Sequence, residues 1–287
     1  MGAGMAGVLA KTGRNLVVWN RSPEKSDALS AEFPGQITIA ASAADVVKAC
    51  GLTFSMLSTP AAAAAVFDAP EVGTLAGVSA GKIVVDCATL QEEDMQRMGA
   101  AVTAAGGKFL EAPVSGTKGP AATGTLIFMV TGDESAFTEA TPEFEAMGKA
   151  THYLGADVGA ATRMKLCVNM VMGVFMAGLG EGIHLAEKLD LEKAKLVEIL
   201  TQGAMGCVLV NVKGPKCALE ERNHAPNFPL KHAQKDVSFA IAAGQAAGAN
   251  TMATAEATNK EMLKAMEMGF GDQDFSSVIE AVMDSQS

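Results

Sequence analysis

The fold is decided by the stretch Gly155-Ala-Asp-Val-Gly159-Ala-Ala-Thr-Arg-Met-Lys165-Leu-Cys-Val-Asn169-Met. Short apolar runs alternate with helical patterns before it, and no strand-like segment follows it. No proline occurs between positions 142 and 215, so the apolar pattern at about 163–189 predicts one uninterrupted helix of roughly 26 residues and roughly 39 Å. The composition shifts near Gly159, which predicts an α/β half at residues 1–160 and an all-helical half at 161–287.

Lys165 and Asn169 stand four residues apart near the start of this helix, so their side chains share one face. A cation and an amide on an otherwise apolar face have two explanations. Lys165 could extend its ammonium group to water while Asn169 bonds a neighbouring loop, or both could serve chemistry. The two residues alone leave both explanations open.

The composition limits the class of protein. A chain of 287 residues, 49% hydrophobic, can bury a large core and is long enough for two domains. Its formal charge of −10 argues against nucleic acid or an anionic membrane as the main partner. The most apolar run, residues 166–179, is shorter than the roughly 20 residues that span a bilayer, so we interpret it as a buried core helix.

Five cysteines are scattered through the chain without C-x-x-C spacing. They indicate reduced thiols of an intracellular protein, which we expect to be cytoplasmic. The spacing signals neither a disulfide framework nor a metal site.

The first residues have the pattern of the second half of a βαβ unit. A helical pattern ends at Gly13 and the strand Leu16-Val-Val-Trp19 follows, but no strand precedes the helix. Gly2 falls where the last glycine of a G-x-G-x-x-G turn would lie. Asn20 follows it by 20 − 2 = 18 residues, close to the roughly 20 that separate this turn from the ribose-binding position.

The ribose-binding position carries Asn20, Arg21 and Ser22, where NAD-binding folds usually place an acidic residue. A carboxylate would repel a 2′-phosphate, whereas a guanidinium can bind it through two hydrogen bonds. The pattern therefore favours NADP (NADPH) over NAD as cofactor. The alternative is that Arg21 is a solvated side chain at a helix start.

Small polar residues follow three further predicted strands. The strands cover residues 52–57, 82–86 and 108–113, and they are followed by Ser58, by Thr89, and by Ser115, Gly116 and Thr117. Because dinucleotides bind at the carboxyl ends of parallel strands, these residues are candidates for a binding site. Each could equally cap a helix or form a tight turn.

Two more strands, at 126–130 and 151–154, complete the α/β half. Beyond the long helix, further helices are predicted at 190–202, 228–247, 251–268 and 276–283. The segment 203–224 is predicted to be irregular because it contains Gly214-Pro215.

Together these features resemble the β-hydroxyacid dehydrogenase family, and within it the branch of glyoxylate/succinic semialdehyde reductases. The resemblance covers nearly the whole chain. It is carried by eight motifs in order: Met1-Gly2-x-x-Met5-Ala6, Val18-Trp19-Asn20-Arg21, Met56-Leu57-Ser58, Asp86-x-x-Thr89, Glu111-Ala-Pro-Val-Ser115-Gly116, Met164-Lys165-Leu-x-x-Asn169, Phe228-Pro-Leu-Lys231-His232-x-x-Lys235-Asp236 and Asp272-x-Asp274-Phe275-Ser276. It implies a Rossmann-like dinucleotide-binding domain and an all-α domain, joined by the long interdomain helix, with the site in the cleft between them.

The resemblance also implies a role for each matching residue. Lys165 would be the catalytic cation, and Asn169 would orient the substrate or Lys165. Substrate carboxylate binding would fall to Ser115, Gly116 and Thr117. The cofactor-binding residues would be Gly2, Asn20, Arg21, Ser22, Leu57, Ser58, Thr89 and Lys235.

These residue types suit the reduction of an aldehyde. Hydride transfer to a carbonyl carbon builds negative charge on the oxygen, which a protonated lysine can stabilise and then protonate. If Lys235 lies near Lys165, its like charge would lower the pKa of Lys165 and ease that transfer. We predict metal-independent, NADPH-dependent reduction of glyoxylate to glycolate, of succinic semialdehyde to 4-hydroxybutyrate, or of both.

The sequence departs from the family pattern in three places. The first strand and two phosphate-loop glycines are missing, which would leave two strand edges unpaired, and we interpret the sequence as a shortened form. The usual Ser-Thr pair after the fifth strand is Ala88-Thr89. The segment before Lys165 is one residue longer than usual and contains Ala160-Ala161 where a glycine is common, which could shift the start of the helix.

Two other functions remain open. The chain could act on 3-hydroxyisobutyrate or tartronate semialdehyde, or it could be a catalytically silent family member that serves as an oligomeric scaffold. The apolar helices of the second half predict a homo-oligomer, a dimer or tetramer. Because any targeting peptide would precede the missing strand, an organellar location cannot be read from this sequence.

Overall fold

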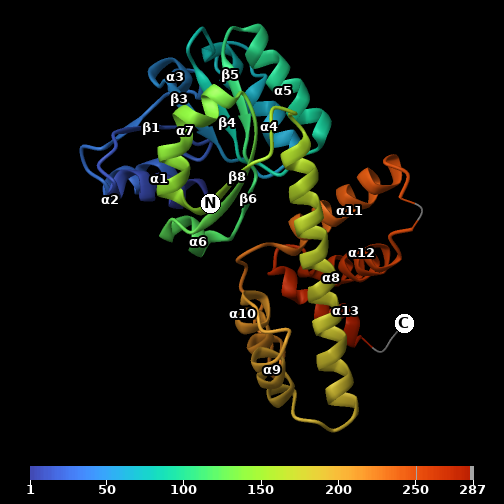
Figure 1. Cartoon of the computed structure of the whole chain (residues 1–287). Coiled ribbons are helices and arrows are strands. Elements are labelled where there is room, and N and C mark those ends of the chain that lie inside the picture. Colours follow the sequence, from blue (N-terminus) through green and yellow to red (C-terminus); the bar gives the residue numbers. More distant parts are fainter. Residues whose placement is uncertain (250, 285–287) are drawn as a thin grey trace. The chain divides into compact units, whose positions relative to one another are not determined.

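The computed structural model describes residues 1–249 and 251–284 (Figure 1). The chain divides into two compact units, Met1–Lys165 and Leu166–Ser287, and the boundary lies within a single helix, α8 (Ala160–Lys188). The first unit combines helices with strands that are mostly parallel. The described part of the second consists of helices, and its one isolated β-bridge pairs Pro229 with Asp274. The chain therefore has the predicted α/β Rossmann-like and all-α halves.

The first unit contains eight strands. They are β1 (Leu16–Val18), β2 (Ile37–Ile39), β3 (Leu52–Ser55), β4 (Ile83–Asp86), β5 (Lys108–Glu111), β6 (Val114–Ser115), β7 (Leu126–Gly132) and β8 (Gly148–Tyr153). Six of them lie within a few residues of the predicted strands. Strand β2 was not predicted, and β6 lies where a loop was predicted.

Two separate sheets hold these strands. In the first, β1 pairs with β2 in parallel. In the second, β3, β4 and β5 are parallel neighbours, and β7 pairs with β5 and β6 in antiparallel and with β8 in parallel. Among the described residues β1 and β3 do not pair with each other, as expected for strands that lack a neighbour between them.

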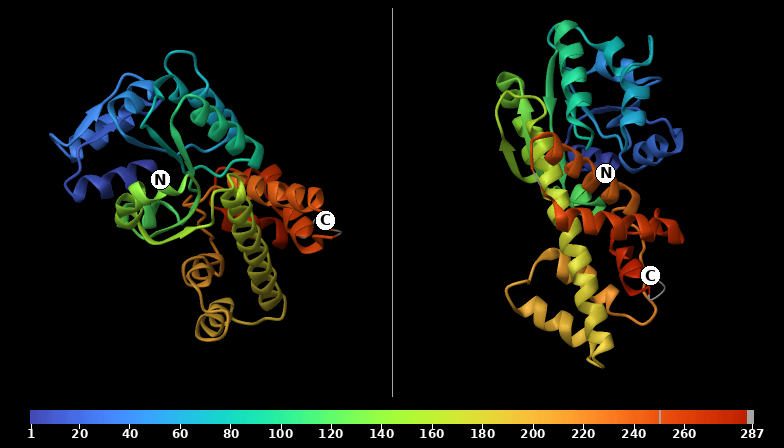
Figure 2. Two further views of the ribbon diagram at one scale, coloured as in Figure 1. Left: turned by 45° about the horizontal axis from the view of Figure 1, so that its top comes forward. Right: turned by 90° about the vertical axis from the view of Figure 1, so that its right-hand side faces the viewer.

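Helices cover both faces of the larger sheet (Figures 1 and 2). The helices of the first unit are α1 (Gly2–Lys11), α2 (Pro23–Glu32), α3 (Ala43–Ala49), α4 (Pro60–Phe67), α5 (Glu92–Ala104), α6 (Lys118–Thr123) and α7 (Glu134–Met147). Ile83 and Val85 of β4 pack with α1 and α7, whereas Val84 between them packs with α3, α4 and α5. Because neighbouring strand residues point to opposite faces, an apolar run such as Ile83-Val-Val is buried on both sides.

The second unit consists of the rest of α8 and shorter helices. These are α9 (Lys193–Gln202), α10 (Val208–Cys217), α11 (Leu230–Ala246), α12 (Ala253–Ala265), a π-helical turn (Met266–Phe270), a 3₁₀ turn (Phe275–Ser277) and α13 (Val278–Met283). Their core includes Met176 and Ile183 of α8, packed with side chains such as Val210, Val237 and Phe275.

The prediction that residues 203–224 are irregular is wrong, because α10 occupies 208–217 with Pro215 inside it. The proline removes one backbone hydrogen bond near the end of the helix. Tertiary packing outweighs that loss, since Val210, Gly214 and Cys217 are buried. A Cβ on Gly214 would lie 2.7 Å from Cγ1 of Val197, so the glycine allows α10 to pack closely against α9.

Helix α8 is longer than predicted. Its 29 residues begin at Ala160, three positions earlier than expected, directly after Gly159 with φ +112°. By length and composition it is the one described helix that could cross a membrane, because it extends well beyond the apolar run at 166–179. About 44% of its most apolar window is buried within the protein, and the core helix of a folded domain meets the same criterion.

Candidate active site

The carboxyl ends of β3, β4 and β5 lie along one edge of the larger sheet, because the three strands are parallel neighbours. Leu57 and Ser58 follow β3, Thr89 follows β4, and the Ser115 segment follows β5. The structure therefore places these candidates along one edge, where dinucleotides bind in such folds. Asn20, Arg21 and Ser22 follow β1, which belongs to the other sheet.

The residues after β1 form a short turn before α2. Oδ1 of Asn20 accepts a hydrogen bond from the backbone N–H of Ser22 at 2.9 Å, and Ser22 occupies the N-cap position of α2. The side chain of Arg21 is exposed. Gly2 is the first residue of α1, whose first turn contains no acidic residue. The positive end of this helix dipole and an exposed guanidinium are compatible with a phosphate-bearing dinucleotide.

The turns after β3 and β4 are held by local hydrogen bonds. Thr59 caps α4 by accepting a hydrogen bond from the N–H of Ala62 at 3.2 Å. Asp86, the last residue of β4, accepts one from the N–H of Ala88 at 2.9 Å and another from the hydroxyl of Ser55. Burial raises the pKa of Asp86 to about 6, with a further contribution from Glu111. Asp86 thus fixes the turn that leads to Thr89.

The Ser115 segment combines a short strand with a tight turn. Ser115 belongs to β6, and Thr117 occupies the N-cap position of α6. Gly116 between them has φ +139°, and a Cβ there would lie 2.7 Å from Cδ2 of Leu126. Glycine is therefore required at this turn for both its backbone conformation and its size.

Lys165 lies in the second turn of α8 and is only 6% exposed. A lysine is seldom this buried unless its ammonium group is paired with another polar group. The ammonium group of Lys165 therefore does not extend into bulk water, which was one of the two explanations for a lysine at this position.

The start of α8 is bound by a buried carboxylate from the sheet. Glu111, the last residue of β5, is 0% exposed. Its Oε1 accepts a hydrogen bond from the N–H of Thr162 at 2.6 Å, and its Oε2 accepts one from the N–H of Gly159 at 2.6 Å. The hydroxyl of Thr131 donates a third, at 2.7 Å to Oε2. Glu111 therefore fixes the first turn of the helix that carries Lys165.

Asn169 belongs to the second unit and is buried there. Its side-chain amide donates a hydrogen bond to Oδ2 of Asp236 on α11 at 2.6 Å. The ammonium group of Lys235 lies 2.8 Å from Oδ1 of the same carboxylate and 5.0 Å from the ring centre of Phe239. The carboxylate of Asp236 thus orients Asn169 and also pairs with Lys235.

Glu111 and Asp236 belong to motifs of the sequence, but the sequence pattern predicted no role for either residue. A signal was present for Glu111, because an acidic residue that ends an apolar strand needs buried donors. Those donors are 48 and 51 residues away along the chain, so they could not be identified. Among the described residues no group of three or more His, Cys, Asp or Glu could hold a metal ion, and all five cysteines are free.

These features define a class of protein: a Rossmann-like dinucleotide-binding unit followed by a helical unit, with a buried lysine where the connecting helix begins. Comparison with protein families supports this class of protein. Residues 1–155 match the NAD-binding domain of 6-phosphogluconate dehydrogenase, and residues 159–282 match the NAD-binding domain of NADP-dependent 3-hydroxyisobutyrate dehydrogenase. The chain belongs to the β-hydroxyacid dehydrogenase family and is an NAD(P)-dependent oxidoreductase of that type.

Three known proteins show the range of its relatives. Glyoxylate/succinic semialdehyde reductase 1 of Arabidopsis thaliana is 42% identical over 98% of this chain and 95% of its own length. Cytokine-like nuclear factor N-PAC of Mus musculus is 36% identical over 98% of this chain but only 49% of its own length. The structure of 3-hydroxyisobutyrate dehydrogenase of Mycobacterium tuberculosis with L-serine superimposes with a TM-score of 0.83 at 28% identity, over 99% of this chain and 96% of that one.

Proposed function

We propose that this protein reduces short carboxylated aldehydes with NADPH, converting glyoxylate to glycolate, succinic semialdehyde to 4-hydroxybutyrate, or both. The observation that carries the proposal is the burial of Lys165 one turn after the helix start that Glu111 binds. The substrates are those named for the Arabidopsis relative, which matches nearly the whole chain.

In this proposal Lys165 is the general acid. Bound NADPH would supply the hydride. The ammonium group of Lys165 stabilises the charge that develops on the carbonyl oxygen and then donates a proton to it. Asn169, oriented by Asp236, positions the substrate or Lys165. Donors from Ser115, Gly116 and Thr117 bind the substrate carboxylate.

The cofactor site of the proposal uses residues that follow β1, β3 and β4, together with Gly2 of α1 and Lys235 of α11. Gly2, at the start of α1, borders the pyrophosphate, and Asn20, Arg21 and Ser22 hold the adenosine end. Leu57, Ser58, Thr89 and Lys235 hold the nicotinamide half. The exposed guanidinium of Arg21 supports a preference for NADP over NAD, because it can bind the 2′-phosphate through two hydrogen bonds.

The test is the variant Lys165→Ala. Loss of a general acid should lower kcat for glyoxylate and succinic semialdehyde by roughly 10²- to 10⁴-fold, while the Kd of NADPH stays within about twofold. Lys231→Ala is the matched control, because Lys231 is exposed and pairs with Asp272. A Lys165→Ala enzyme with full turnover would show that the assigned role is wrong.

The preferred aldehyde and the preferred coenzyme are identified by measuring kcat/KM for each aldehyde with NADPH and with NADH. The proposal predicts higher values with NADPH and with glyoxylate or succinic semialdehyde. Higher values for tartronate semialdehyde, or for oxidation of 3-hydroxyisobutyrate, would favour the related enzyme activities instead.

A second candidate is a catalytically silent, oligomeric scaffold. It is favoured by the similarity to a relative named as a nuclear factor. Titration of the folded protein with NADPH, followed by fluorescence, discriminates between the candidates, since absence of binding would favour the scaffold. In either case we propose a homo-oligomer, because Leu185, Leu189, Leu191, Ile199 and Val208 of the second unit are exposed.

A further inference from the structure

The N-terminus of α8 is bound differently from other helix starts of the first unit. Helices α3, α4 and α7 are each capped by the side chain of their own N-cap residue: Ser42, Thr59 and Asp133. Helix α8 instead receives its acceptor from β5. The first turn of a helix has unpaired N–H groups, and a carboxylate is a strong acceptor for them. The cap therefore connects α8 directly to the sheet.

Both oxygens of Glu111 are used. Thr162 donates to Oε1, whereas Gly159 and the hydroxyl of Thr131 donate to Oε2. Thr131 lies opposite Glu111 in the pairing of β5 with β7, so the carboxylate is itself held in place by the neighbouring strand. A bidentate contact to two N–H groups of one helical turn restricts both the position of the helix end and its rotation about the axis.

Lys165 follows Thr162 by 165 − 162 = 3 residues, which is about 4.5 Å along the helix axis. No flexible segment separates the capped turn from Lys165, because α8 is continuous from Ala160. A change in the rotation of the first turn would therefore move the ammonium group. Displacement of a catalytic group by about 1 Å can lower a rate by roughly 10²-fold.

We propose that Glu111 is a positioning residue, which fixes the first turn of α8 and thereby sets the orientation of Lys165. This inference rests on the proposed role of Lys165 in aldehyde reduction. The carboxylate does not touch substrate or transfer a proton; it acts through the helix.

The variant Glu111→Gln tests the proposal with little change in shape. An amide has one acceptor oxygen, and its NH₂ group must occupy either the Oε1 or the Oε2 position. In both orientations a backbone N–H, that of Thr162 in α8 or that of Gly159 directly before it, then faces another donor. We expect kcat to fall by roughly 10- to 100-fold, with a smaller change in KM and with the Kd of NADPH within about twofold of the wild type.

Two further variants separate positioning from folding. Glu111→Asp keeps both oxygens and should recover part of the kcat that Glu111→Gln loses. Thr131→Val removes one donor but leaves both helix contacts, so it should lower kcat only about threefold, which corresponds to the small net contribution of one hydrogen bond. If Glu111→Gln does not fold, Thr131→Val and Glu111→Asp carry the test, and wild-type kcat in both would overturn the proposal.

The matched control is Asp133→Ala, which removes the carboxylate cap of α7 in the same unit. Helix α7 carries none of the proposed site residues, so the kcat of the Asp133→Ala variant should remain near the wild-type value. The proposal is overturned if Glu111→Gln retains wild-type kcat, or if Asp133→Ala lowers kcat equally.

A measurement independent of turnover distinguishes this inference from the proposed function. The rate at which an amine-reactive reagent labels Lys165, followed by mass spectrometry, should rise in Glu111→Gln and stay unchanged in Asp133→Ala. If the wild type reduces no aldehyde, the proposed function fails, but the labelling still decides whether Glu111 sets the environment of Lys165. Unchanged labelling in Glu111→Gln would overturn the positioning role.

Discussion

The two units stabilise their buried carboxylates in different ways. In the first unit, Asp86 is bound by a backbone N–H and a hydroxyl, and Glu111 is bound by two backbone N–H groups and a hydroxyl. In the described part of the second unit, the buried carboxylates of Asp236 and Asp274 and the half-buried carboxylate of Glu280 each face a cation. Asp236 pairs with Lys235, Asp274 with Lys213, and Glu280 with Arg222 and His224.

The difference changes how readily the carboxylates are protonated. Burial raises the pKa of Asp86 to about 6, because its donors carry only partial charges. Burial also acts on Glu280, but the hydrogen bonds from Arg222 and His224 outweigh it and lower its pKa to about 2. The pKa of Asp274 is likewise lowered, since Lys213 outweighs the effect of burial. Asp274 and Glu280 of the helical unit therefore stay ionised at neutral pH.

The comparison also bears on function. The buried charged residues of the first unit are Asp86, Glu111 and Lys165, and the proposed mechanism needs Lys165 as a proton donor. Binding carboxylates through backbone groups fixes the turn before Thr89 and the start of α8 without using further cations. The second unit uses ion pairs to hold irregular segments together.

The largest predicted effect comes from removing a cation in the second unit. Nζ of Lys213 lies 2.7 Å from Oδ1 of Asp274, and both residues are buried. The variant Lys213→Met would leave the carboxylate without its cation, which costs about 3–5 kcal/mol for a buried pair. We expect the free energy of unfolding, measured by urea denaturation, to fall by that amount.

Lys195→Met is the control, because Lys195 pairs with Glu198 on the exposed surface of the same unit. Its unfolding midpoint should stay close to that of the wild type. If Lys213→Met is as stable as Lys195→Met, the backbone donors from Asn227, Phe228 and Ser276 suffice for Asp274, and the contrast between the units is lost.

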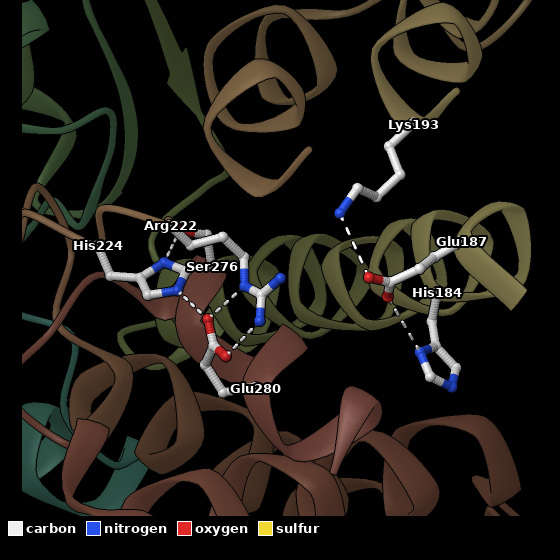
Figure 3. A network of polar contacts seen from close by, with 7 residues as sticks. All are labelled: His184, Glu187, Lys193, Arg222, His224, Ser276 and Glu280. Carbon is white, nitrogen blue, oxygen red and sulfur yellow. Dashed lines mark hydrogen bonds and ion pairs between the residues drawn. The ribbon is translucent and has the colours of Figure 1, made fainter. Parts of the chain in front are cut away.

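A smaller effect is predicted for Glu280, whose carboxylate lies between Arg222 and His224 in Figure 3. Arg222 binds it through two hydrogen bonds of 2.6 and 2.8 Å, and Nε2 of His224 lies 2.7 Å from Oε1. Because the pKa is lowered from 4.5 to about 2, ionised Glu280 stabilises the fold above pH 4.5. Glu280→Gln should cost about 2–3 kcal/mol at pH 7, by the conversion of about 1.4 kcal/mol per pKa unit.

The pH dependence provides the check on Glu280. The stabilisation should be lost as pH falls from 4.5 towards 2, so the difference between wild type and Glu280→Gln should narrow in that range. Glu198→Gln, at an exposed ion pair, should leave the unfolding midpoint unchanged. A constant difference at every pH would mean that packing, and not the ion pair, explains the loss.

Local patterns predicted most of the fold, and the misses have physical reasons. Strand β4 is predicted from its apolar run, which is buried along its whole length. Strand β2 has only three residues, of which two are exposed, so it has no such run. Helix α10 was missed because Gly214-Pro215 disfavours a helix locally, while its packing against α9 favours one. Long-range packing of this kind cannot be read from a window of sequence.

The candidate site shows the same limit. Lys165 and Asn169 were identified because four-residue spacing places them on one helix face. The partners that hold them, Glu111 and Asp236, lie 51 residues before Thr162 and 67 residues after Asn169. Spacing within a helix is a local property, whereas a contact across a sheet or between helices depends on the complete fold.

The smallest predicted effect is that of Asp86→Asn, and its sign is opposite to that of Glu280. The pKa of Asp86 is raised from 3.8 to about 6, so the folded protein holds a proton that the unfolded chain releases. Its contribution to stability is present below pH 3.8 and is lost as pH rises through 6. We expect wild type to lose about 2–3 kcal/mol relative to Asp86→Asn between these values, measured by urea denaturation across that range. Asp133→Ala is a reference with the opposite pH dependence. Hydrogen bonds from Ser135 and Ala136 lower the pKa of Asp133, so wild type should gain stability relative to Asp133→Ala as pH rises. If wild type gains stability relative to Asp86→Asn as pH rises from 3.8 to 6, the N–H and hydroxyl donors bind this carboxylate as strongly as a cation would, and the two units do not differ in the way proposed.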